Sequence, residues 1–130
     1  NTPTPVHAIE HALSGYYDIT HGEGLAIITP HWMRHVLNER TQERIVKFGV
    51  NVFGLAADQA PSEIAEQTIA RTAQFFKSLG MPMTLREVGI DDSRLEEMAH
   101  HIAVNEGLDA PGTFAPLNEQ GILSILKAAL

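Results

Sequence analysis

The sequence feature that most restricts the fold is the spacing of the apolar residues, which recur every three or four positions in one segment after another. This spacing places them on one face of a helix. In residues 41–53, for example, Ile45, Phe48, Val52 and Phe53 share an expected face. No segment of useful length alternates apolar and polar residues, as a half-buried strand does. The sequence therefore predicts an all-α fold.

Glycine, proline and capping residues divide the chain into expected helices over about residues 3–14, 21–38, 41–53, 62–79, 92–102 and 117–130. Pro30 falls inside the second helix, where it should bend the helix without ending it. The connector MPMTLREVGI, residues 81–90, is the only candidate for extended structure. The segment EGLDAPGTF, residues 106–114, is an expected loop.

The composition excludes several classes of function. The 130 residues are 44% hydrophobic and 19% charged, which is typical of one globular domain. Cysteine is absent, so disulfides, thiolate metal sites and cysteine nucleophiles are excluded, and any metal must be held by His, Asp or Glu. A net charge of −7 disfavours nucleic-acid binding, and neither a membrane helix nor a signal peptide is recognisable. We therefore expect a cytoplasmic protein without nucleic-acid or membrane partners.

Three of the seven histidines lie close together in HAIEHALSGYYDITHG, residues 7–22. His7 and His11 are four positions apart on an expected helix, so they lie on one face of it. His21 follows a turn at the start of the next helix, which can fold back and bring its ring towards the other two. This spacing favours half of a metal site, while the alternative is that each ring is an ordinary hydrogen-bonded core histidine.

The shorter motif H-x-x-E-H, formed by His7, Glu10 and His11, suits a different chemistry. In inverted zincin proteases the two histidines bind zinc and the glutamate stands beside the metal. A later glutamate would complete the set of ligands. This alternative makes Glu10 essential for activity, and replacing Glu10 by Gln should remove activity while keeping the metal.

A longer pattern runs through His7, His11, Leu13, His21, Gly22, Ala26, Pro30, Trp32 and Met33. It resembles the signature of the iron-containing (group III) alcohol dehydrogenases, and most of all their butanol dehydrogenase and aldehyde reductase branch. In that family H-x-x-x-H-x-L is followed, ten residues after the second histidine, by H-G-x-x-x-A and an apolar helix with a proline. The resemblance continues in AEQTIARTAQFFKSLGMPMTLREVGI, where Gly80 and Pro82 match a family helix that ends in F-F-x-x-L-G-x-P.

This resemblance implies a two-domain enzyme with the dehydroquinate-synthase-like fold. Enzymes of that family usually form dimers. An N-terminal α/β domain binds NAD(P), and an all-helical C-terminal domain holds one divalent ion, Fe²⁺ or Zn²⁺. An Asp and a His of a D-x-x-x-H helix bind the ion together with two histidines, whose counterparts here are His7 and His21. His11 matches a catalytic histidine that does not bind the metal but lies towards the nicotinamide and the substrate. The implied reaction oxidises a small alcohol or reduces an aldehyde, and it leaves Glu10 dispensable for metal binding.

Two features of that family have no counterpart in this sequence. Neither HGEG nor GYYD is a G-x-G-x-x-G phosphate loop, and no strand precedes them. No D-x-x-x-H is present, because Asp18, Asp91 and Asp92 have no histidine four residues later. We therefore expect residues 1–130 to be the helical metal-binding domain of a longer enzyme, without the N-terminal dinucleotide-binding domain and inactive alone. The alternative is a stand-alone, non-catalytic helical module with structural histidines.

The remaining histidines and aromatic residues have simpler interpretations. His31 and His35 flank Trp32 and Arg34 on an expected, partly exposed helix, so a second metal site there is not favoured. His100 and His101 should be surface residues at the end of an acidic helix. Trp32, Met33, Phe75 and Phe76 are expected in the core or in an interface, and Phe114 is a weaker candidate for the substrate cleft.

Overall fold

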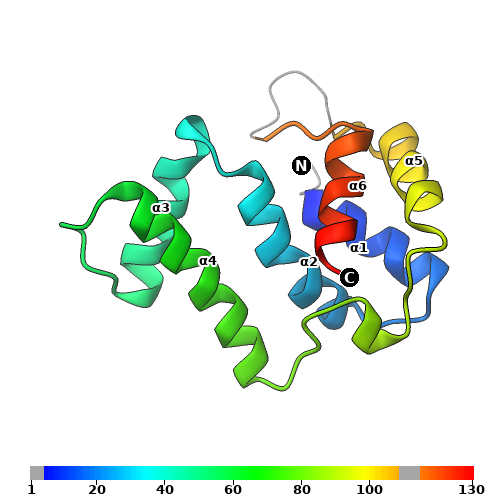
Figure 1. The fold of residues 1–130 in the computed structure, drawn as a ribbon, viewed down its shortest axis with the longest axis horizontal. Coiled ribbons are helices and arrows are strands. Elements are labelled where there is room, and N and C mark those ends of the chain that lie inside the picture. The colour runs from blue at the N-terminus through cyan, green and yellow to red at the C-terminus, as the bar shows by residue number, and fades with distance from the viewer. Residues whose placement is uncertain (1–4, 109–114) are drawn as a thin grey trace.

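The computed structural model describes residues 5–108 and 115–130. Over these residues it contains helices and no strand, which confirms the predicted all-α class (Figure 1). The helices are α1 (Pro5–Tyr16), α2 (His21–Val36), α3 (Glu39–Phe53), α4 (Pro61–Ser78), the 3₁₀ turn η1 (Arg86–Val88), α5 (Leu95–Glu106) and α6 (Glu119–Ala128). Phe114 lies outside the described residues. None of the described helices is both long and apolar enough to cross a bilayer.

Two predicted boundaries are wrong because the capping residues were misassigned. Helix α3 begins at Glu39 rather than Thr41, since the Asn38 side chain accepts hydrogen bonds from the N–H groups of Arg40 and Thr41. The Thr41 hydroxyl in turn accepts one from the Asn38 N–H at 3.0 Å. Helix α5 begins at Leu95, three residues after Asp92. It continues to Glu106, so His100 and His101 lie in its middle rather than at its end.

The connector of residues 81–90 is not extended. Glu87 accepts hydrogen bonds from the N–H groups of Met83 and Thr84, which folds the segment back into the 3₁₀ turn. These two donors stabilise the charged carboxylate and lower the pKa of Glu87. The connector is also tied to the end of the chain, because the Leu85 N–H donates to the carbonyl oxygen of Ala129 at 2.7 Å.

Helix α2 lies between two groups of helices and packs against both (Figure 1). On one side α1, α5 and α6 enclose the larger apolar cluster, which includes Ile9, Leu13, Ile27, Ile102 and Ile122. On the other side α3 and α4 form a helical hairpin with a small cluster of Met33, Ile45, Ala65 and Ile69. Pro30 lies within α2, which continues to Val36 as predicted.

The buried face of α3 differs from the predicted one. Ile45 is buried, but Phe48 and Val52 are 42% and 60% exposed. The reason is a close approach of α3 to α4 at Gly49, where an added Cβ would lie 2.0 Å from Oγ1 of Thr68. Helix α3 thus packs against α4 through Gly49, and Phe48 lies beside this contact, partly exposed.

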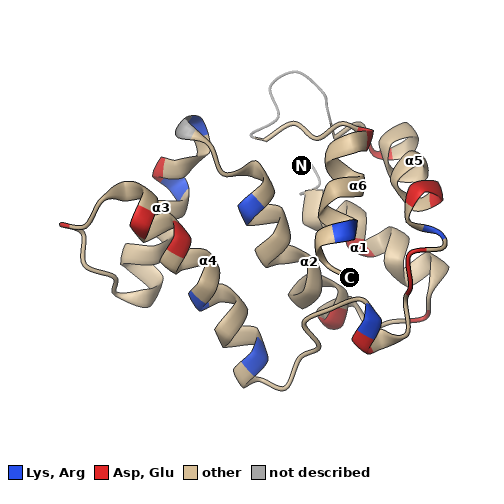
Figure 2. Cartoon of the chain, in the orientation of Figure 1, with Lys and Arg blue, Asp and Glu red and all other residues tan. Residues whose placement is uncertain are grey.

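Charged residues are spread over the fold. Figure 2 shows Lys and Arg on several described helices, interleaved with Asp and Glu rather than gathered on one element. Ion pairs at the surface include Arg34 with Glu66 and Arg94 with Glu97. Exposed pairs of this kind contribute about 0–1 kcal/mol each. The fold therefore depends mainly on the two apolar clusters.

Candidate metal centre

Helices α1 and α2 bring the three histidines of the first segment together. One ring nitrogen of each of His7, His11 and His21 lies within 4.8 Å of the others. All three side chains are exposed, and they form the only such group of His, Asp or Glu found among the described residues. The fold-back of His21 towards the His7–His11 face occurs as the spacing predicted.

The three rings are oriented differently. His7 and His21 are stacked, with ring centroids 5.0 Å apart and an interplanar angle of 15°. The ring of His11 is turned relative to both, by 67° from His7 and by 54° from His21. His7 and His21 thus form a pair, and His11 lies beside that pair.

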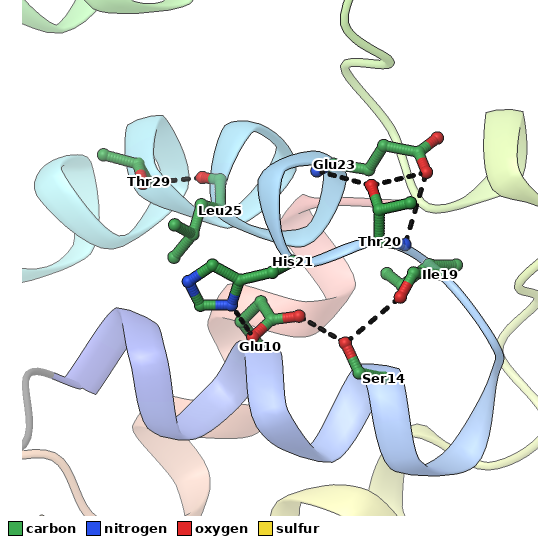
Figure 3. A network of polar contacts seen from close by, with 8 residues as sticks. All are labelled: Glu10, Ser14, Ile19, Thr20, His21, Glu23, Leu25 and Thr29. Atoms are coloured by element: carbon green, nitrogen blue, oxygen red, sulfur yellow. Dashed lines mark hydrogen bonds and ion pairs between the residues drawn. The ribbon is translucent and has the colours of Figure 1, made fainter.

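A capping box formed by Thr20 and Glu23 determines that α2 begins at His21. Thr20 is the N-cap of α2, and its hydroxyl accepts a hydrogen bond from the Glu23 N–H at 3.3 Å. The Glu23 carboxylate accepts one from the Thr20 N–H in return, which completes a capping box (Figure 3). His21 is therefore the first residue of α2 and faces α1 across a four-residue connection.

Glu10 lies next to Nδ1 of the His21 ring, a contact that the sequence pattern did not predict. Its side chain is 1% exposed, and its Oε2 lies 2.5 Å from Nδ1 of His21 (Figure 3). Its Oε1 accepts a hydrogen bond from the Ser14 hydroxyl. The sequence did hold a signal, because Glu10 stands on the buried face of α1 beside Ile9 and Leu13, where a carboxylate needs partners.

The geometry at Glu10 does not support the inverted zincin alternative. A general base must reach a water molecule next to the metal. Both oxygens of Glu10 instead have partners within the protein, and the side chain is buried between α1 and α2. The carboxylate thus faces His21 and Ser14 rather than the surface where the three rings meet.

A cavity of about 400 Å³ lies next to His7. Its wall is mainly apolar and includes Val6, Leu25, Phe76 and Met81. Phe76, which was expected in the core or in an interface, is half-buried beside this cavity. An aliphatic chain of a few carbons suits such a wall.

The other four histidines are not part of this group of three. Burial, together with the nearby Arg34 charge, lowers the pKa of the half-buried His31 below 6.5. His35 is exposed. His100 is exposed as predicted, and its Nδ1 lies 2.8 Å from an Oε1 of Glu119 on α6.

Comparison with known families identifies the domain to which these helices correspond. Residues 2–130 match the family described as "Fe-containing alcohol dehydrogenase family, C-terminal". The chain is 46% identical over 121 residues to NADH-dependent butanol dehydrogenase A of Clostridium acetobutylicum, covering 93% of this chain and 31% of that protein. It is 42% identical to NADH-dependent butanol dehydrogenase B of the same organism, covering 100% and 33% respectively.

A solved structure gives the same result. The crystal structure of NADH-dependent butanol dehydrogenase A from Thermotoga maritima superposes with a TM-score of 0.81 at 29% identity, over 95% of this chain and 32% of that one. This chain therefore spans about a third of the length of the relatives that it matches. Sequence and helix arrangement agree, and the chain belongs to the Fe-containing alcohol dehydrogenase family, whose C-terminal helical domain it matches over nearly its whole length.

Proposed function

We propose that this chain is the helical, metal-binding domain of a two-domain alcohol dehydrogenase that oxidises a small alcohol, or reduces an aldehyde, with NAD(P)(H). The N-terminal dinucleotide-binding domain of that enzyme is not part of these residues. In this proposal His7 and His21 bind a divalent ion, Fe²⁺ or Zn²⁺, and His11 faces the substrate and the nicotinamide. The convergence of these three imidazoles on one surface is the observation that carries the proposal.

The chemistry of the donors supports a metal at this position. Imidazole nitrogen is a good ligand for iron and for zinc, and both ions accept ligands from more than one segment. Two histidines leave room for further ligands from another domain. When bound, the metal would polarise the alcohol or aldehyde oxygen, and the dinucleotide would carry the hydride.

The surroundings of the centre support a small, partly apolar substrate. The cavity beside His7 is lined mainly by aliphatic and aromatic side chains, so it offers apolar contacts next to that ring. The named activity of the two Clostridium relatives is butanol dehydrogenation with NADH. A short primary alcohol or its aldehyde is therefore the substrate class that we propose.

A chimaera provides the test. This chain replaces the matching C-terminal third of the Clostridium butanol dehydrogenase A, and NADH oxidation by butanal is measured after incubation with Fe²⁺ or Zn²⁺. We expect metal-dependent turnover from the chimaera, and none from either part alone. The variant His21→Ala should lose both metal and turnover, whereas His11→Ala should lose turnover and keep the metal.

Two results would contradict the proposal. A folded chimaera that binds the dinucleotide but has no turnover would favour a stand-alone helical module with structural histidines. Enzyme-like turnover by the 130-residue chain alone would contradict the requirement for a dinucleotide-binding domain. A Zn²⁺ titration of the chain alone should show weak binding that is removed by His7→Ala, because only part of the ligand set is present.

A further inference from the structure

Among the residues that the structure describes, Glu10 is the only ionisable side chain that is fully buried. Burying a carboxylate is unfavourable unless hydrogen bonds replace its hydration. Glu10 has such partners on both oxygens, the Ser14 hydroxyl and the His21 ring. The side chain is thus held from two sides in one orientation (Figure 3).

The fold also makes room for this carboxylate. Gly24 faces Glu10 from α2, and a Cβ at Gly24 would lie 2.5 Å from Cγ of Glu10. No Cβ atom tolerates that distance, so any larger residue at position 24 would displace the Glu10 side chain. The site between α1 and α2 is therefore shaped around this one residue.

The bond to Glu10 determines which ring nitrogen of His21 is available. A carboxylate only accepts hydrogen bonds, so the nitrogen that faces it, Nδ1, carries the proton. In the neutral ring Nε2 then keeps its lone pair on the opposite edge, away from Glu10 (Figure 3). A lone pair in that position is what a metal ligand requires.

We propose that Glu10 is the positioning residue of this centre, which fixes the tautomer and the ring orientation of His21 with Ser14 as its support. This inference rests on the proposed function, since it assigns His21 to a metal. It goes beyond that function because it assigns a role to a residue that was expected to be dispensable for metal binding. Glu10 acts through His21 and touches neither substrate nor metal.

The first measurement is made without any metal. Long-range ¹H–¹⁵N correlation spectra of the 130-residue chain, recorded well above the usual imidazole pKa range, report which nitrogen carries the proton in each histidine. We expect His21 to be the Nδ1–H tautomer in the wild type. In Glu10→Met, which keeps the length of the side chain but has no strong acceptor, we expect a mixture dominated by Nε2–H.

The second measurement is the affinity for Zn²⁺ by calorimetric titration. Glu10→Met should bind about 10- to 100-fold more weakly than the wild type. Glu10→Gln keeps an oxygen acceptor and should recover the tautomer and part of the affinity. Glu96→Met removes a carboxylate from the exposed face of α5 and should change neither property, which controls for the loss of charge.

Each outcome separates the two proposals. If the wild type does not bind Zn²⁺, the metal assignment fails, and the tautomer spectra still decide whether Glu10 orients His21. An unchanged tautomer in Glu10→Met, or an unchanged affinity with a changed tautomer, would overturn the positioning role. If Glu10→Met does not fold, Ser14→Ala provides the same comparison, because it removes only the support and should give a smaller change in the same direction.

Discussion

At the scale of single residues, the three histidines of the centre have different neighbours. His21 is held from behind by Glu10, and its backbone is fixed by the capping box of α2. His7 stacks on His21 and borders the apolar cavity. His11 lies one helical turn from His7 and borders a second cavity with Tyr16 and His101. Similar residues in one short segment are thus suited to different roles.

His31 allows a pH-dependent prediction. Its pKa is lowered in the folded state by burial and by Arg34, so the unfolded chain binds more protons between that lowered pKa and about 6.5. The free energy of unfolding is therefore reduced as the pH falls through this range. We expect His31→Gln to lose less stability than the wild type between about pH 7.5 and about pH 5.5.

Urea unfolding at both pH values measures this difference, and His35→Gln, at an exposed site on the same helix, is the control. Equal losses in His31→Gln and in the wild type would show that His31 titrates as a solvent-exposed ring does. NMR titration of the His31 ring provides the independent check.

At the scale of the element, the α3–α4 contact depends on Gly49. A methyl group at this position would overlap Thr68, whose Cβ lies only 3.2 Å from the added atom, so the two helices would have to separate. We expect Gly49→Ala to lower the free energy of unfolding by about 2 kcal/mol or more, in spite of the better helix propensity of alanine. Thermal or urea unfolding measures the change.

Gly15→Ala is the matched control for this prediction. Nothing lies within 4 Å of the Cβ that alanine would add at the end of α1. This variant should be neutral, or more stable by up to about 1 kcal/mol. Destabilisation of similar size in both variants would contradict the packing argument.

The helices illustrate how far the sequence leads. Apolar spacing predicted the α-helices of the described residues in their order, since every predicted helix overlaps an observed one, but it did not predict the turn η1. It did not predict the buried face of α3, because helix packing there is decided by the smallest residue, Gly49, and not by the largest, Phe48. The start of α3 was misplaced because Asn38 was assigned to the end of the preceding helix rather than to a cap.

The sequence likewise predicted one part of the histidine centre and not another. Spacing predicted that His7, His11 and His21 would lie close together. Helical periodicity and a short turn together determine the backbone positions from which these side chains extend. The contact between Glu10 and His21 depends on side-chain rotamers and on the space left by Gly24, which no periodicity reports. A carboxylate on an apolar helix face was the available clue.

At the scale of the whole molecule, the two apolar clusters differ in size. The larger one is enclosed by four helices, whereas the α3–α4 hairpin shares only a small cluster with the end of α2. Stability should therefore be uneven, because local opening exposes less apolar surface in the hairpin. We expect backbone amides in α3 to exchange with deuterium faster than those in α6.

Hydrogen exchange followed by mass spectrometry resolves these segments. Helix α6 packs within the larger cluster, so it provides the internal reference. Equal protection in α3 and α6 would mean that the chain opens as one unit. In that case the hairpin would owe its stability to the whole fold rather than to its own small cluster.

The fit between Glu10 and Gly24 also has an evolutionary consequence. Because the Glu10 side chain occupies the space that a side chain at position 24 would need, position 24 can acquire one only after position 10 has changed. A lineage that shortens the side chain at position 10 releases position 24 to acquire one, and the reverse order of substitution passes through a clash. Across descendants of a common ancestor, substitutions at positions 10 and 24 should therefore be correlated. Their pattern should show in which lineages the contact between Glu10 and His21 arose or was lost.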